Sequence, residues 1–251
     1  MAYRALFLSS DLGDGTPQNF TTRFSPPIDL NDGGDYAIAL DNVSHIYSWY
    51  NIADKYNNRT LKYIDSTGPT TYTLTLNEGQ YSIELLNDAL HNEMYDNGHY
   101  TTTGGVITYP IDIVADFATG KVKVIINDGN FELDLQTDDL NELLGFTKKV
   151  VVATELGSSP ANINNGVVGL LLHADIADGV YSGKYAGNAI TSYLPNNYPF
   201  FTINYKPYNH VWVPISKKYI ESINIRFTDQ NNNELDLNGE ALSCTLLIKK
   251  V

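Results

Sequence analysis

The stretch that decides the fold lies in the middle of the chain. It opens as Tyr72-Thr-Leu-Thr-Leu-Asn-Glu-Gly-Gln-Tyr-Ser-Ile-Glu-Leu-Leu-Asn-Asp-Ala-Leu90 and closes as Asp138-Asp-Leu-Asn-Glu-Leu-Leu-Gly-Phe146. Each end contains a helix pattern, whereas the residues between them alternate between apolar and polar as strands do. Two helices with strands between them predict a small α+β unit.

The first helix is predicted to begin after Ser82, because a serine oxygen can accept a hydrogen bond from the free N–H groups of a first turn. Its apolar face follows at helical spacing, with Ile83, Leu86, Ala89, Leu90 and Met94. The second, shorter helix has Thr137 as its predicted cap. It should end at Gly145, since glycine readily adopts the left-handed conformation that stops a helix.

Strand patterns dominate the rest of the chain. Between the helices, residues 106–114 read as one strand that turns at 116–120 and returns from Lys121. Residues 36–50 predict a long or bent strand rich in aromatics, and the apolar run 167–176 predicts a strand buried on both faces. Further strands are expected at 219–227 and 242–248, with a turn at 229–233 between them.

Two changes in composition mark boundaries. A polar segment begins at Asn51, and a loop-like segment covers residues 150–165. Neither the first ~50 nor the last ~85 residues hold enough strands to bury two sheet faces alone, so these flanks are expected to pair. The prediction is a mostly-β protein, with one domain formed by residues 1–55 and 165–251 and an α+β insertion at 56–164.

Charge and composition exclude several classes of protein. The 251 residues carry a net charge of −13, which argues against direct binding of nucleic acid, since that needs clustered Lys and Arg. We find no secretory signal and no apolar run long enough to span a membrane. The single cysteine, Cys244, rules out an intrachain disulfide framework, and its apolar surroundings predict a buried thiol.

No pattern of catalytic or metal-binding residues is found. The five histidines form none of the paired spacings of zinc sites, and His173 is expected in the core. The acidic turns at Asp11 and Asp229 offer oxygens for calcium, but turn chemistry explains both. A glycosidase would need two carboxylates facing one cleft, and no spacing marks such a pair. We therefore expect no cofactor and no enzyme.

The middle segment resembles the insertion domain of adenovirus-type penton bases. The resemblance rests on Leu76-Asn-Glu-Gly79-Gln-Tyr81-Ser82, on Leu86-Asn-Asp-Ala89 and on the closing Leu140-Asn-Glu-Leu-Leu-Gly-Phe146. The C-terminal part is similar to minor capsid proteins of Polinton elements and virophages. It has the matching segments Leu170-Leu-Leu-His-Ala-Asp175-Ile, Val213-Pro-Ile-Ser, Ile223-Asn-Ile-Arg-Phe, Thr228-Asp-Gln-Asn and Thr245-Leu-Leu-Ile-Lys-Lys.

This resemblance implies a single jelly-roll β-sandwich that forms a homopentamer at the vertices of an icosahedral capsid. It implies a place in the virion beside a double jelly-roll major capsid protein, with a host receptor or a fibre protein as a further partner. One departure concerns the receptor: the chain contains no Arg-Gly-Asp, so integrin-type binding has no support.

Aromatic residues are the predicted subunit contacts. Tyrosine is unusually frequent, with 18 copies, and Trp and Tyr are enriched at interface hot spots. The predicted contact residues are Trp49, Tyr50, Tyr205, Tyr208 and Trp212, and packing in the core is the alternative for each. The alternative function is a trimeric, lectin-like or fibre-head β-sandwich that binds a receptor or glycan, because the same fold serves both roles.

Overall fold

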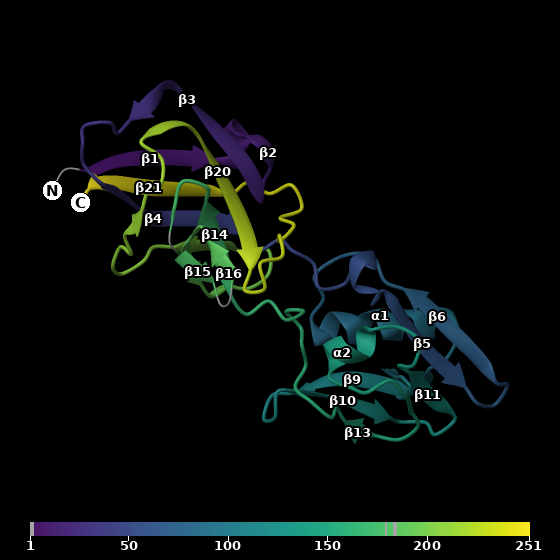
Figure 1. Cartoon of the computed structure of the whole chain (residues 1–251). Coiled ribbons are helices and arrows are strands. Elements are labelled where there is room, and N and C mark those ends of the chain that lie inside the picture. The colour runs from purple at the N-terminus through teal and green to yellow at the C-terminus, as the bar shows by residue number, and fades with distance from the viewer. Residues whose placement is uncertain (1–2, 179, 183–184) are drawn as a thin grey trace. The chain divides into compact units, whose positions relative to one another are not determined.

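A computed structural model describes residues 3–178, 180–182 and 185–251 of the chain. It consists of two compact units (Figure 1). The first, Met1–Trp49 with Val167–Val251, is called the jelly-roll unit below. The second, Tyr50–Gly166, is called the insertion unit.

The first sheet of the jelly-roll unit brings together the two ends of the chain. Its antiparallel path is β1 (Tyr3–Ser9), β21 (Ser243–Lys250), β4 (Tyr36–Ile46) and β18 (Thr202–Tyr205), and the short β19 (Val213–Pro214) also pairs with β4. Figure 1 shows β1 in purple beside β21 in yellow, the first and last strands of the protein. The flanks of the sequence therefore do pair with each other.

The second sheet faces the same core from the other side. Its order is β17 (Ala189–Tyr193), β14 (Leu170–Ala174), β20 (Tyr219–Asp229), β3 (Asn19–Asp29) and β2 (Asp14–Thr16). A short 3-10 turn, η1 (Ser10–Leu12), joins β1 to β2, and the hairpin of β15 (Val180–Ser182) and β16 (Tyr185–Gly187) precedes β17. β14 is buried along its whole length, as its apolar run predicts.

The connections make this unit a single jelly roll. The chain passes repeatedly from one sheet to the other. From β1 in the first sheet it crosses to β3 in the second and returns to β4, then crosses to β14 and β17 and returns to β18. It finally crosses to β20 and returns to β21. The insertion unit interrupts one of these crossings, between β4 and β14. The predicted fold class, a mostly-β single jelly roll with a smaller α+β insertion, is confirmed.

One hydrophobic core lies between the two sheets. Phe20 on β3 and Phe227 on β20 are fully buried there, and Leu246 on β21 meets them from the first sheet. Cys244 is buried beside them, as predicted. His173 on β14 is also in the core, where its Nε2 lies 3.0 Å from Thr228 Oγ1. The expected core position of His173 is thus confirmed, with a hydrogen-bond partner at Nε2 and, among the described residues, none at the buried Nδ1.

The insertion unit contains two sheets, a small hairpin and two helices. One sheet is β13 (Glu155–Leu156), β10 (Lys121–Ile126) and β9 (Ile111–Asp116). The other is β12 (Val150–Val151), β11 (Phe131–Asp134), β5 (Thr60–Asp65) and β6 (Thr70–Thr75). The remaining elements are η2 (Asp54–Tyr56), α1 (Ile83–Asp96), the hairpin β7 (Thr101–Thr103) with β8 (Val106–Thr108), and α2 (Leu140–Leu144).

The helix predictions hold with one correction. Ser82 caps α1, since its side chain accepts from the Leu85 N–H, and the apolar face is buried. Gly145 ends α2 with a φ of 75°. Thr137, however, is not the cap of α2, because that helix begins two residues later, with Asp139 at the N-cap position and no side-chain cap. Thr137 instead accepts a hydrogen bond from Lys62 Nζ.

The predicted strand 106–114 is in fact two strands. β8 ends at Thr108 and pairs with β7, whereas β9 begins at Ile111 and pairs with β10. Pro110 lies between them, and a proline has no N–H to continue a ladder. Its carbonyl instead accepts from the Asn127 N–H at 2.7 Å, which anchors the start of the β9–β10 pair.

The division between the units falls at Tyr50 and at Val167, rather than at residues 56 and 165. The reason is local hydrogen bonding within the insertion unit. Ile52 exchanges backbone hydrogen bonds with Gly79, and the side chain of Asn51 donates to the carbonyls of Tyr81 and Ile163. The polar segment that marked the predicted boundary is therefore the first ordered part of the insertion unit.

Candidate assembly surface

The loop between β17 and β18 carries an exposed apolar group. Its members, called the aromatic loop below, are Leu194, Tyr198, Phe200 and Phe201, each at least 60% exposed. Burying an aromatic side chain is worth several times more than burying a small one, so four large apolar side chains in water are a cost to the isolated chain. Exposed apolar patches of this kind mark interaction surfaces.

Hydrogen bonds hold the aromatic loop in place. The Phe200 N–H donates to the Tyr47 carbonyl, and the Tyr47 N–H donates to the Phe201 carbonyl. Asn197 accepts from the Tyr198 N–H and donates to the Thr202 carbonyl, both at 2.9 Å. Phe200 has a φ of 66°, a conformation that an aromatic residue rarely adopts. The loop thus presents its aromatics in a defined geometry.

Tyr205 has a structural role in addition to any contact role. Its ring stacks on Tyr193, with centroids 4.6 Å apart and planes at 7°. Tyr193 is buried and its hydroxyl lies 2.9 Å from His45 Nε2. One face of Tyr205 is therefore taken up by the core, and only the rest of the half-buried side chain is open to solvent.

The segment after β18 presents Tyr208 and Trp212 in different ways. Tyr208 is 100% exposed. Trp212 is half-buried, with Lys249 Nζ 4.1 Å above its ring centroid, a cation–π contact that ties it to β21. In the same segment, His210 Nε2 and Lys206 Nζ both approach Asp41 Oδ1, at 3.1 and 3.6 Å. These contacts anchor the segment beside β4.

The predicted residues Trp49 and Tyr50 lie in different surroundings. Trp49 is only 2% exposed and its ring stacks on Tyr47 with centroids 4.0 Å apart. The alternative of core packing therefore holds for Trp49, whose side chain offers almost no surface to a partner. Tyr50 is half-buried and belongs to the insertion unit, whereas the other four predicted residues belong to the jelly-roll unit.

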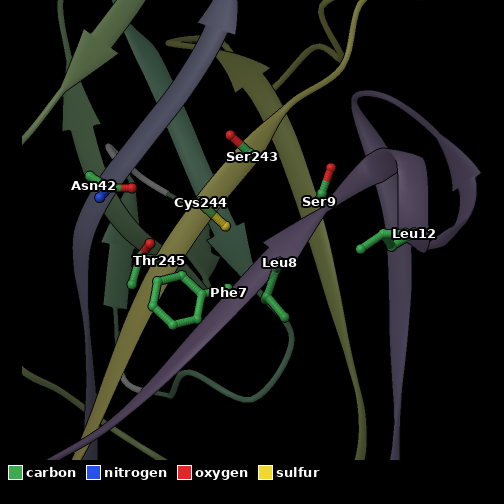
Figure 2. Close-up of a pocket in the computed structure, with 8 residues that line it drawn as sticks. All are labelled: Phe7, Leu8, Ser9, Leu12, Asn42, Ser243, Cys244 and Thr245. Carbon is green, nitrogen blue, oxygen red and sulfur yellow. The ribbon is translucent and has the colours of Figure 1, made fainter.

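A second surface with exposed apolar side chains lies where β1 ends and β21 begins. A hollow of about 210 Å³ is lined there by residues from three strands and the following turn, namely Phe7, Leu8, Ser9, Leu12, Asn42, Ser243, Cys244 and Thr245. Figure 2 shows the ring of Phe7 beside Thr245, its partner in the ladder. Phe7 is 80% exposed and Leu12 is also exposed. This surface is called the β1 hollow below.

A crystal structure of the mavirus penton protein matches all of this chain and all of its own, with a TM-score of 0.51 and 12% sequence identity. The chain has a penton-like fold. No protein-family model matches the sequence. No curated protein matches it either.

Three buried titratable groups of this penton-like jelly roll have strongly shifted pKa values. Burial lowers the pKa of His45 to about 4, against a weaker opposing effect of its hydrogen bond to the Ile46 carbonyl. Burial lowers the pKa of His173 to about 4 as well, with Arg226 adding to the effect. Burial raises the pKa of the Cys244 thiol to about 12. These groups are thus uncharged at neutral pH.

The described residues provide neither a metal-binding cluster nor a membrane-spanning helix. Within the described ranges, no three His, Cys, Asp or Glu side chains gather in a way that could hold a metal ion. The Asp229 turn shows instead the expected turn chemistry, since its carboxylate accepts from the N–H groups of Asn231 and Asn233. No helix in the same part of the chain is long and apolar enough to cross a membrane.

Sequence reasoning missed two of the most exposed apolar groups. Tyr198, Phe200 and Phe201 form the run Tyr-Pro-Phe-Phe, which directly precedes a strand and follows two asparagines. Aromatics beside turn-forming residues are a usable signal for display on a loop. Phe7 offered no such signal, because it stands in the continuous apolar run Ala5-Leu-Phe-Leu8, which does not show which side chains face solvent.

Proposed function

We propose that this protein is a viral capsid protein of the penton type, which assembles as a homopentamer at the vertices of an icosahedral virion. The observation that carries the proposal is the penton-like fold, which matches the mavirus penton protein over the full length of both chains. The sequence resemblances to penton bases and minor capsid proteins point to the same assignment.

The two exposed apolar surfaces suit a ring. A cyclic pentamer needs a head-to-tail contact, in which each subunit uses two different surfaces. The aromatic loop and the β1 hollow are two such surfaces, on different strands of one jelly roll. We propose that Tyr208 and the exposed part of Trp212 extend the first of them, while Trp49 serves only the core.

Other partners follow from a vertex position. The outer rim of a penton would contact a double jelly-roll major capsid protein, and a fibre or host receptor would bind on the outside. These partners are part of the proposal. Aromatic side chains that stay exposed in the pentamer are the candidate contact sites for these partners, because an exposed apolar patch often marks an interaction surface.

Native mass spectrometry across protein concentration tests the proposal. We expect a discrete pentamer, which Phe200→Ser with Phe201→Ser should shift toward monomer. Val106→Ser is a matched control, since it replaces an equally exposed apolar side chain in the insertion unit. Circular dichroism checks that each variant remains folded.

Two results would contradict the proposal. A discrete trimer would favour the fibre-head or glycan-binding alternative instead. A monomer at every concentration, which also fails to enter particles when the major capsid protein of the same virus is co-expressed, would exclude a vertex role.

A further inference from the structure

The insertion unit has a groove of its own, between α1 and β9. The groove has a volume of about 320 Å³ and is lined by apolar side chains, among them Ile83, Ile113 and Phe117. Its polar lining comes mainly from α1, where Glu84 and Asp88 lie one turn apart. A helix beside a strand edge is one of the arrangements that bind extended peptides, because the peptide can join the sheet.

β9 is an edge strand with a partly protected edge. It pairs with β10 on one side only. On the other side, α1 supplies substitutes for a missing strand: Asn87 Oδ1 accepts from the Ile113 N–H at 2.6 Å, and His91 Nε2 lies 3.1 Å from the Ile111 carbonyl. These two contacts show that the backbone groups of odd-numbered β9 residues point away from β10.

Ala115 is the next residue on that edge. Outward-pointing residues alternate along an antiparallel strand, so the N–H and carbonyl of Ala115 face the groove side as well. In the part of the chain that the structure describes, neither group has a hydrogen bond on this side. Unpaired edge groups are a template for another strand, and here they border a groove.

Phe117 closes one end of the groove. It stands 88% exposed at the tip of the β9–β10 hairpin. Asp116 holds this tip through its side chain, which accepts from the Ala118 N–H and from the Thr119 hydroxyl. The Gly120 N–H also donates to the Asp116 carbonyl. The exposed ring is thus carried on a well-braced turn.

The charge on the rim defines the partner. Glu84 and Asp88 are both exposed, and among the described residues neither forms an ion pair. Like charges at this helical spacing repel, so they are a small cost to the free protein. The whole insertion unit is acidic, with 16 Asp and Glu against 7 Lys and Arg over residues 50–166. A cationic partner is complementary, whereas a second copy of this unit is not.

We propose that this groove binds an extended segment of another protein, which adds a short strand to β9 at Ala115. One apolar side chain of the segment packs against Ile83 and Phe117, and a neighbouring Lys or Arg reaches Glu84 and Asp88. The backbone supplies affinity and the charged rim supplies selectivity. This site lies in the insertion unit, and its occupation does not depend on the pentamer.

A basic strand peptide is the probe for this groove. A short, end-capped peptide that alternates valine and lysine is titrated into the full chain and followed by fluorescence anisotropy. We expect saturable, salt-sensitive binding, and no binding of the same peptide with glutamate in place of lysine. In the unmodified protein, hydrogen exchange at the Ala115 amide should slow when the valine–lysine peptide is present.

Variants separate charge from strand addition. Glu84→Gln with Asp88→Asn should weaken binding by roughly tenfold or more, the effect of losing charge-assisted hydrogen bonds. Glu221→Gln with Glu240→Gln removes the same charge from exposed sites of the jelly-roll unit and should change little. Ala115→Pro removes the edge N–H, is tolerated at strand edges, and should also weaken binding.

Four results would overturn the proposal. They are no saturable binding to the unmodified chain, equal weakening by the control pair, unchanged exchange at Ala115 in the presence of the peptide, and self-association of the chain that Ala115→Pro abolishes. The last result would assign the groove to a second copy. If the chain binds the peptide but forms no pentamer, only the vertex proposal is contradicted. If it forms a pentamer but does not bind the peptide, only the groove proposal is contradicted.

Discussion

The ring of Tyr205 lies flat on the ring of Tyr193, and the Tyr193 hydroxyl in turn contacts His45 at 2.9 Å. The chain of contacts runs from a partly exposed aromatic to a buried imidazole. His45 Nδ1 lies 3.1 Å from the Ile46 carbonyl, so this nitrogen must donate. Nε2 of the neutral ring must then accept from the Tyr193 hydroxyl. One arrangement of protons therefore satisfies the Ile46 carbonyl, the His45 ring and the Tyr193 hydroxyl together.

Tyr193→Phe removes one partner from this arrangement and leaves Nε2 of His45 buried without a donor. We expect a loss of about 1–3 kcal/mol in the free energy of unfolding. Urea unfolding followed by tryptophan fluorescence measures it, because both tryptophans belong to the jelly-roll unit. Tyr198→Phe removes a hydroxyl from an exposed ring and is the matched control. Equal stability of the two variants would show that the His45 contact contributes nothing.

The stability of the jelly-roll unit should fall as the pH is lowered from about 6.5 to about 4. His45 and His173 have folded-state pKa values of about 4, below the ordinary value of 6.5, because burial disfavours the charged ring. The unfolded chain therefore binds more protons in this window, and acid favours unfolding. The contribution of His45 is roughly 3 kcal/mol over the whole window.

Unfolding midpoints at several pH values measure this dependence. His45→Gln should reduce the dependence of the unfolding free energy on pH between pH 6.5 and 4, whatever its effect on stability at neutral pH. The window lies above the ordinary pKa of Asp, so the carboxylates with lowered pKa values, such as Asp32, add their effect only at lower pH. A slope that the variant leaves unchanged would assign the acid sensitivity to other groups.

The two tryptophans should respond in opposite ways to truncation. Trp49→Ala removes a buried ring stacked on Tyr47 and should cost about 3–5 kcal/mol of stability. Trp212→Ala removes a half-buried ring that contacts Lys249, and should weaken the oligomer while leaving the fold. Thermal unfolding and native mass spectrometry on both variants separate the two effects. Unfolding of the Trp212 variant would instead assign that ring to the core.

Gly145→Ala should destabilise the insertion unit strongly. Gly145 has a φ of 75°, and a Cβ there would lie 2.3 Å from the Ser159 carbonyl oxygen. The strain of the left-handed conformation alone costs about 1–2 kcal/mol, and the clash adds to it. Gly68→Ala, which meets no atom within 4 Å, is the control. Far-UV circular dichroism follows α1 and α2, and similar stability of both variants would contradict the prediction.

Cys244 should not react with thiol reagents in the folded protein. It is 3% exposed, and burial raises the pKa of its thiol to about 12, so the reactive thiolate is scarce at neutral pH. Titration with a chromogenic disulfide should show no reaction until denaturant is added, and then one thiol per chain. Rapid labelling of the native protein would mean that the strand pair β1–β21 opens readily.

The local features of the insertion unit were predictable because their causes are local. Ser82 caps a helix whose apolar residues already recur at helical spacing, and Gly145 ends the next one because few other residues adopt its conformation. The cap of α2 was misplaced at Thr137, since that hydroxyl has a distant partner, Lys62, that no local pattern reveals. The single strand expected at 106–114 is interrupted at Pro110, because a proline has no N–H to continue a ladder and its carbonyl accepts from the Asn127 N–H.

The sequence by itself determined the class of the protein: mostly β, with paired flanks and an α+β insertion, because periodicity and turn residues act over a few neighbours. The tertiary structure alone decided what each aromatic does. Trp49 and Tyr208 look alike as interface candidates, yet one is buried and the other is fully exposed. It also decided where the β1 hollow and the edge at Ala115 lie. The hollow forms because β1 and β21, far apart in the sequence, lie side by side, and the edge is open because β9 pairs with β10 on one side only.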